Sequence, residues 1–144
     1  MTTTQVPIGK TIRELTIPQA LEALEKAVEL RGKDFVYPDD EKINGKTCQY
    51  TREVDGTKVG SCLVGVALID VLGLPPEHMA GSTLSASAAL TRLGVTDAGV
   101  RRVFGAAQGA QDDGRSWGTS LDLARAEATL IAAVEAVTKG STEL

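Results

Sequence analysis

Several features are scarce in this chain of 144 residues, and each scarcity excludes a class of protein. Aromatic residues make up only 3%, so the core must be built from aliphatic side chains and alanine, which favours closely packed helices. Two cysteines are too few for a disulfide scaffold, and we expect them to be free thiols. No segment reaches the roughly 18 apolar residues of a membrane span, and the first residues lack a signal-peptide pattern. We therefore expect a cytoplasmic protein without a cofactor.

The acidic balance of the chain argues against one further class. The net charge is −4 and the isoelectric point is about 5.0, which does not fit a general binder of nucleic acids, although a local basic face remains compatible. The length suits one domain with a core that needs no disulfide or structural metal. We predict a single globular domain over residues 1–144, with residues 1–7 and 140–144 disordered.

The stretch from residue 46 to residue 74 is predicted to form the centre of the fold. It contains Asp55-Gly56, a dipeptide typical of a type I′ turn, in which both central residues take positive φ. Short strands on either side of this dipeptide would form a β-hairpin. The hairpin would lead directly into the next element of the chain.

A strongly apolar segment follows this hairpin. Between residues 62 and 72 only Asp70 is charged, and a helix that is apolar all round is buried all round. Ser61 is a suitable N-cap and Gly73 a suitable left-handed stop. A buried strand over residues 63–66 is the alternative, but it lacks the length and the caps. We therefore predict a central buried helix.

Four further helices are expected around the central one. The first begins at a capping box formed by Thr16 and Gln19 and ends before Gly32. The others are expected over residues 84–93, 97–111 and 120–138. The predicted fold class is mainly α (α+β), with about five helices packed around the central buried helix and one small two-stranded β-hairpin.

Two of these helices carry further predictions about packing. Glycines in the 97–111 helix predict a closely packed neighbour, because each costs about 1 kcal/mol relative to alanine. They are Gly99, Gly105 and Gly109. The last helix is expected to carry one apolar side opposite a charged one, and the apolar side is formed by Leu123, Leu130, Ile131, Val134 and Val137.

Cys62 is the weak catalytic candidate. It would lie at the start of the buried helix, where the positive end of the helix dipole favours a nucleophilic thiolate. Its apolar neighbours favour burial instead, where cysteine behaves as a small hydrophobic residue. The single His78 has no recognisable partner, and the spacing of Cys48, Cys62 and His78 matches no zinc motif. We predict no catalytic residue and no metal site.

Residues 86–104 have the spacing of a helix-turn-helix, with Gly94 in the turn. Three arginines make this segment net positive and could contact phosphates: Arg92, Arg101 and Arg102. Against DNA binding, Leu90 replaces the usual small residue, and the second helix begins with few side chains that could read bases. Two helices joined by a glycine turn are also common in helix bundles.

Three short motifs occur in order along the chain. They are Cys48-x-Tyr50, Gly60-Ser-Cys62-Leu-Val-Gly65, and Ala107-Gln-x-x-Gln111-Asp-x-Gly114-x-x-Trp117-Gly118. Together they resemble an uncharacterised family of short hypothetical proteins of actinobacteria and their phages, over residues 20–125. The family has no established activity, so the resemblance implies an origin and no catalytic residues. The chain departs from the family where Gly60-Ser61 replaces a proline, and where the buried helix lacks a histidine.

The resemblance draws attention to the segment from Gln111 to Gly118. Because loops carry function more often than cores do, Gln111, Asp112 and Trp117 are candidates for a partner-facing loop. The alternative, which we favour for Trp117, is that this side chain packs as a hydrophobic staple for the last helix.

The leading functional hypothesis follows from the weakness of every catalytic candidate. It is a small, non-catalytic, cytoplasmic accessory or regulatory protein that binds an unknown protein partner, with a homodimer as one form of such binding. The first alternative is a helix-turn-helix DNA-binding regulator. The second is a thiol-dependent enzyme or redox protein that uses Cys62.

Overall fold

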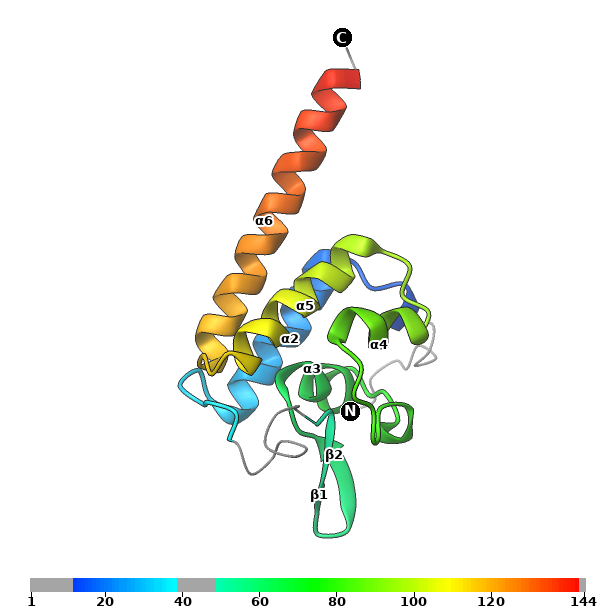
Figure 1. The fold of residues 1–144 in the computed structure, drawn as a ribbon, viewed down its shortest axis with the longest axis vertical. Coiled ribbons are helices and arrows are strands. Elements are labelled where there is room, and N and C mark those ends of the chain that lie inside the picture. The colour runs from blue at the N-terminus through cyan, green and yellow to red at the C-terminus, as the bar shows by residue number, and fades with distance from the viewer. Residues whose placement is uncertain (1–11, 39–48, 143–144) are drawn as a thin grey trace, which may run out of the picture.

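The computed structural model describes residues 12–38 and 49–142. Within them the chain is mainly helical with one antiparallel hairpin, which confirms the predicted fold class (Figure 1). The expectations for residues 1–7, for Cys48 and for residues 143–144 lie outside the described residues. The elements are α2 (Ile17–Arg31), β1 (Thr51–Val54), β2 (Thr57–Gly60), α3 (Leu63–Gly65), η2 (Val66–Val71), η3 (Pro76–His78), α4 (Ala86–Arg92), α5 (Ala98–Asp112) and α6 (Trp117–Thr142).

The first helix and the hairpin form where local sequence signals place them. The hydroxyl of Thr16 accepts the backbone N–H of Gln19, and the side chain of Gln19 accepts the N–H of Thr16, which completes the capping box. Asp55 and Gly56 have φ values of 51° and 80°, both positive as a type I′ turn requires. The register pairs residue 51 with residue 60 and residue 54 with residue 57.

The central buried helix is formed by α3 and η2 together. Every residue from 63 to 69 is buried, and Gly73 ends the helix with a φ of 81°, as predicted. Its second part, η2, has wide π-type turns, since the N–H of Leu72 reaches back five residues to the carbonyl of Ala67. The side chain of Ser61 does not cap this helix, so that prediction is wrong. Its hydroxyl lies 2.7 Å from the hydroxyl of Tyr37 instead.

Two glycines allow the hairpin to lie directly against this helix. A Cβ atom on Gly60 would lie 2.5 Å from the Cα of Val66, and one on Gly65 would overlap the carbonyl oxygen of Tyr50. The N–H of Gly60 also donates to the carboxylate of Asp70 at 3.1 Å. An isolated two-stranded hairpin is marginal in water, so this close contact explains its stability.

α5 lies at the centre of the helix packing. It packs against α2, α3, α4 and α6. Its buried side includes Val100, Val103, Phe104 and Ala107, the four residues predicted for its inner face. α5 therefore joins the buried helix to the C-terminal helix.

α6 begins earlier and ends later than predicted. It starts at Trp117 instead of near residue 120, and it continues to Thr142, so residues 140–142 are helical and not disordered. Ser116 precedes it and accepts the N–H of Thr119 at 3.2 Å. Figure 1 shows the C-terminal half of α6 leaving the body of the protein. No helix in the described ranges is both long enough and apolar enough to span a membrane.

Trp117 packs the start of α6 against the segment that follows α2. Its ring is fully buried and meets Phe35 edge to face at a centroid distance of 4.9 Å. The guanidinium of Arg31 lies 3.9 Å from the centre of the Phe35 ring. The backbone N–H of Trp117 donates to the carbonyl of Phe35 at 2.8 Å. Trp117 thus packs inward as the sequence favoured, but its partner Phe35 lies outside α6, so the contact is not a hydrophobic staple within the helix.

Candidate functional site

Cys62 does not lie at an accessible site. Its side chain is fully buried beside the start of α3, and its backbone N–H donates to the carbonyl of Gln49 at 3.0 Å. His78 is exposed in η3 and lines an open cleft to which Cys62 does not contribute. A substrate therefore has no direct access to the thiol in this conformation.

Two glutamines on α5 occupy the start of the buried helix. The side-chain oxygen of Gln111 accepts the N–H of Leu63 at 2.8 Å, and that of Gln108 accepts the N–H of Val64 at 3.4 Å. These two N–H groups are therefore not available to a phosphate or another anion. The glutamines of the third motif have a structural role, since both are buried and both cap the helix.

The loop predicted to face a partner is mostly turned inward. Gln111 and Trp117 are buried, so the prediction is wrong for these two residues. Gln111 points inward because it caps the buried helix, and Trp117 does so because it packs against Phe35. Asp112 is exposed, and its carboxylate accepts a hydrogen bond from the side-chain amide of Gln111 at 2.9 Å.

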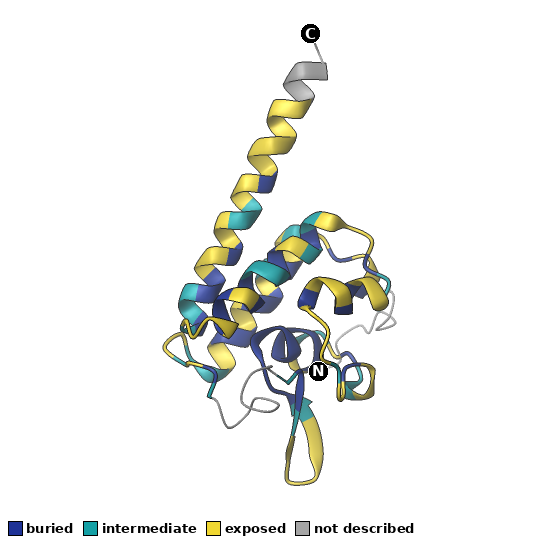
Figure 2. Cartoon of the chain, viewed as in Figure 1, coloured by how far each residue is buried: buried dark blue, intermediate teal, exposed yellow. Residues whose placement is uncertain are grey.

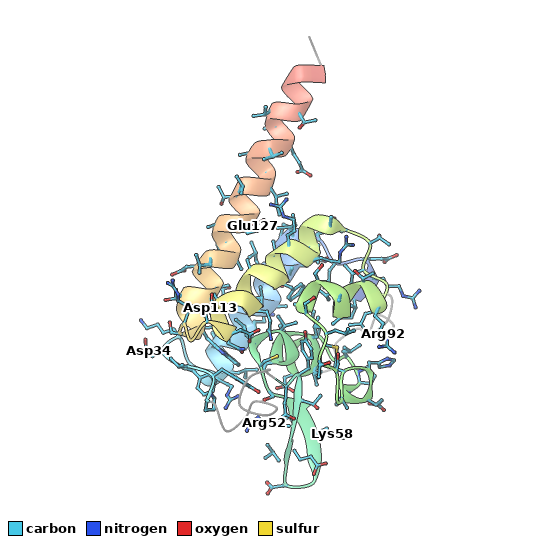
Figure 3. All side chains as sticks on the ribbon, in the orientation of Figure 1. Asp34, Arg52, Lys58, Arg92, Asp113 and Glu127 are labelled. Carbon is cyan, nitrogen blue, oxygen red and sulfur yellow. The ribbon has the colours of Figure 1, made fainter. Side chains whose placement is uncertain are left out.

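Two of the three arginines predicted to contact DNA make contacts within the protein. Arg101 donates to the carbonyl of Val95 at 3.0 Å, and Arg102 forms an ion pair with Glu127 of α6 at 2.5 Å. Figure 3 shows Glu127 on α6 beside α5. Arg101 is thus held within the helix-turn-helix segment, and Arg102 is held against α6.

Arg92 is the exception among the three. It is exposed at the end of α4, on the side of the molecule away from α6 (Figure 3). It lines an open cleft together with Arg13 and His78, and the apolar part of the lining includes Leu74 and Leu93. Because basic side chains gather there, this cleft is the part of the helix-turn-helix region best suited to an anion.

α6 carries two apolar sides. One packs against the body through Leu121, Ala124 and Ile131, which are buried. The other is 42 to 70% exposed at its four large side chains, and we call this set the α6 stripe: Leu123, Leu130, Val134 and Val137. The sequence placed these four residues on one side of the helix together with Ile131, but the structure separates them, because Ile131 is buried and the four are exposed. Hydrophobic periodicity identifies the apolar sides of a helix. When a helix has two such sides, periodicity does not tell which side packs against the core.

The α6 stripe borders a groove between α5 and α6. The α5 side of the groove includes Gly105, Ala106 and Gly109, and the α6 side includes Leu123, Ala126 and Leu130. A Cβ atom on Gly105 or Gly109 would meet no described atom within 4 Å, so the expectation of a packed neighbour is wrong for both. It is confirmed for Gly99, which lies against Ile17. The groove is therefore shallow, and its lining combines these small and apolar residues with Asp113, Arg115 and Glu127.

Beyond the body, α6 continues with little polarity. All residues from 132 to 138 are exposed, and Glu135 is the only charged residue among them (Figure 2). A helix that is apolar on most sides is normally buried. Contiguous exposed apolar surface on a protein marks an interaction site. The α6 stripe and the groove are thus the strongest candidate site.

Comparisons with protein-family models, with curated proteins and with solved structures find no match. The resemblance to a family of actinobacterial and phage proteins therefore stays a prediction. Among the described residues, no three His, Cys, Asp or Glu side chains gather where they could hold a metal ion.

Sequence reasoning missed the groove and misplaced the α6 stripe. The signal for the stripe was available in the spacing of Leu123, Leu130 and Val137, which recur every seven residues. A second apolar side, through Leu121 and Ala124, was also available. A helix with two apolar sides has more apolar surface than one core contact can cover. The sequence contained no signal for the groove, because a helical glycine that packs against a neighbour cannot be distinguished in the sequence from one that faces solvent.

Proposed function

We propose that this protein acts by binding another protein through the α6 stripe and the adjoining α5–α6 groove. The observation that supports the proposal is the exposure of four large apolar side chains on one side of one helix. Complete burial of a Val or Leu side chain contributes about 1.5–3 kcal/mol, so covering the exposed part of these four would contribute roughly 4 kcal/mol. A surface of this kind suits a non-catalytic accessory or regulatory protein.

Photo-cross-linking in the cells that naturally produce the protein tests this proposal. A photoreactive phenylalanine analogue at Val134 should yield a discrete covalent adduct whose members are identified by mass spectrometry. The control places the same analogue at Ala132, which is exposed but points to the opposite side of α6, since two residues turn a helix by about 200°. Equal labelling from both positions, or none from Val134, would contradict the proposal.

DNA binding is the second candidate function, and one observation favours it. Arg13, His78 and Arg92 line one cleft beside the helix-turn-helix segment. Anisotropy of labelled duplex DNA at several salt concentrations tests it, because phosphate contacts weaken steeply with salt. Replacing Arg92 by alanine should then reduce the affinity more than replacing Arg102, which is paired with Glu127. The absence of binding at low salt would remove this candidate.

A further inference from the structure

We infer that the occupant of the α6 stripe is a second copy of this chain, paired antiparallel along α6 with a two-fold axis at Leu130. This inference rests on the proposed function, because it names the partner of the same surface. It predicts an isologous homodimer, in which the same residues of both copies form the interface.

The spacing of the stripe is self-complementary about Leu130. Leu123 and Val137 each lie seven residues from Leu130, on opposite sides of it, so an antiparallel pair places one against the other. Ala126 and Val134 each lie four residues away and are paired in the same way. All five residues lie on one side of the helix, because steps of three, four and seven residues return to the same side. The small Ala126 then faces the larger Val134, and the two Leu130 side chains meet at the axis.

The same arrangement covers both exposed features of each copy at once. The groove lies beside residues 123–130 of α6, and the projecting part of the stripe lies at residues 130–137. In an antiparallel pair centred on Leu130, the projecting part of one copy lies over the groove of the other. Gly105 and Gly109, which are open to the surface, would then let the incoming helix approach closely. Any other partner would need one surface that fits the α5–α6 groove and a second surface that covers the projecting end of α6.

The charges at this surface also fit an antiparallel pair. Glu127 is the only charged residue of α6 that lines the groove, and its carboxylate is paired with Arg102 of the same chain. The antiparallel register places Glu127 opposite Ala133 and so separates the two Glu127 residues by about 9 Å along the axis. A parallel pair in register would bring the two carboxylates together. Antiparallel helices also align opposite ends of their dipoles.

The size of the surface fits a weak but specific dimer. The helix side from Leu123 to Val137 is about 22 Å long, and with the α5 side of the groove it offers on the order of 600 Å² per copy. Two copies would bury about 1,200 Å², which is the lower end of the range for specific interfaces. We therefore expect a dissociation constant in the micromolar range.

Sedimentation of the purified full chain from low micromolar to several hundred micromolar concentration tests the dimer. The wild-type chain should change from monomer to dimer over this range. Leu130→Glu should weaken the association by at least about a hundredfold, because the two carboxylates would meet at the axis. The matched control is Leu30→Glu, which makes the same change at a residue of α2 that is 63% exposed and does not line the groove. The control should associate like the wild type.

Disulfide cross-linking tests the register. In a Cys48→Ser background, Leu130→Cys should give a covalent dimer, and Val137→Cys alone should not, because the two copies of residue 137 lie about 21 Å apart along the axis of an antiparallel pair. A mixture of Leu123→Cys and Val137→Cys chains should form a mixed disulfide. Self-linkage of Val137→Cys would overturn the antiparallel arrangement.

The two sets of experiments separate this inference from the proposed function. A chain that stays monomeric at every concentration, or that dimerises equally well with Leu130→Glu, would overturn the inference. A photo-adduct between Val134 and a different protein would also overturn it, yet it would leave the proposed function intact. A dimer that requires Leu130 and a Val134 adduct of twice the chain mass would support both.

Discussion

Replacing Gly65 by alanine should strongly destabilise the protein, because the hairpin lies on the buried helix at this residue. The added Cβ would overlap the carbonyl oxygen of Tyr50 and would lie 2.9 Å from the carbonyl carbon, where ordinary contacts begin at 3.4 Å. The backbone at Tyr50 must therefore move by at least 0.5 Å, the difference between these distances. Both groups are backbone, so no side-chain rotation can relieve the contact.

The cost has two parts. Overpacking a rigid core contact costs about 1–3 kcal/mol. The carbonyl of Tyr50 also accepts the N–H of Ser61 at 2.9 Å, and moving it weakens a hydrogen bond with a net contribution of about 1 kcal/mol. The expected loss is about 3 kcal/mol of the free energy of unfolding, which corresponds to a fall in Tm of roughly 10 °C for a chain of this size.

Urea unfolding at low protein concentration, where a micromolar dimer is dissociated, measures this loss. The fluorescence of Trp117, the only tryptophan and a fully buried one, reports the transition. The control is Gly105→Ala in α5, where an added Cβ meets no described atom within 4 Å, and which should raise the free energy of unfolding by up to about 1 kcal/mol. An unfolding midpoint for Gly65→Ala equal to that of the wild type would refute the close contact between hairpin and helix.

Two further predictions concern buried groups. Gln111→Leu should lower the free energy of unfolding by about 2 kcal/mol, because the buried N–H of Leu63 loses its acceptor, and a wild-type urea midpoint would contradict the capping role. In a Cys48→Ser background, Cys62 should resist a thiol reagent in the native protein and react in urea, because it is fully buried; rapid native labelling would instead support the thiol-dependent alternative.

The parts of the fold that the sequence predicted depend on neighbouring residues. The capping box at Thr16 and Gln19, the turn at Asp55-Gly56 and the stop at Gly73 each involve groups a few residues apart, and all three form as predicted. The buried helix could be recognised because Asp70 is its only charged residue, so nearly all of its surface is apolar.

The parts that failed depend on residues far apart in the chain. Ser61 was a suitable cap by local rules, but Tyr37 lies next to it in space and holds its hydroxyl. Gln111 was taken for a surface residue because nothing near it in sequence shows that it reaches Leu63. The same limit applies to the candidate site: the α6 stripe could be read from the helical period, but its exposure depends on where α2 and α5 lie.

The capping of the buried helix has a consequence for the order in which the chain can fold. Its first N–H groups are capped by side chains 44 and 48 residues later in the chain. During synthesis, the most apolar helix of the protein therefore emerges before α5 is available to complete it. An N-terminal fragment that ends before residue 98 would lack both capping glutamines and all of α5. We expect the ribosome to release most of the chain before this helix can be buried stably, so that folding is completed late in translation.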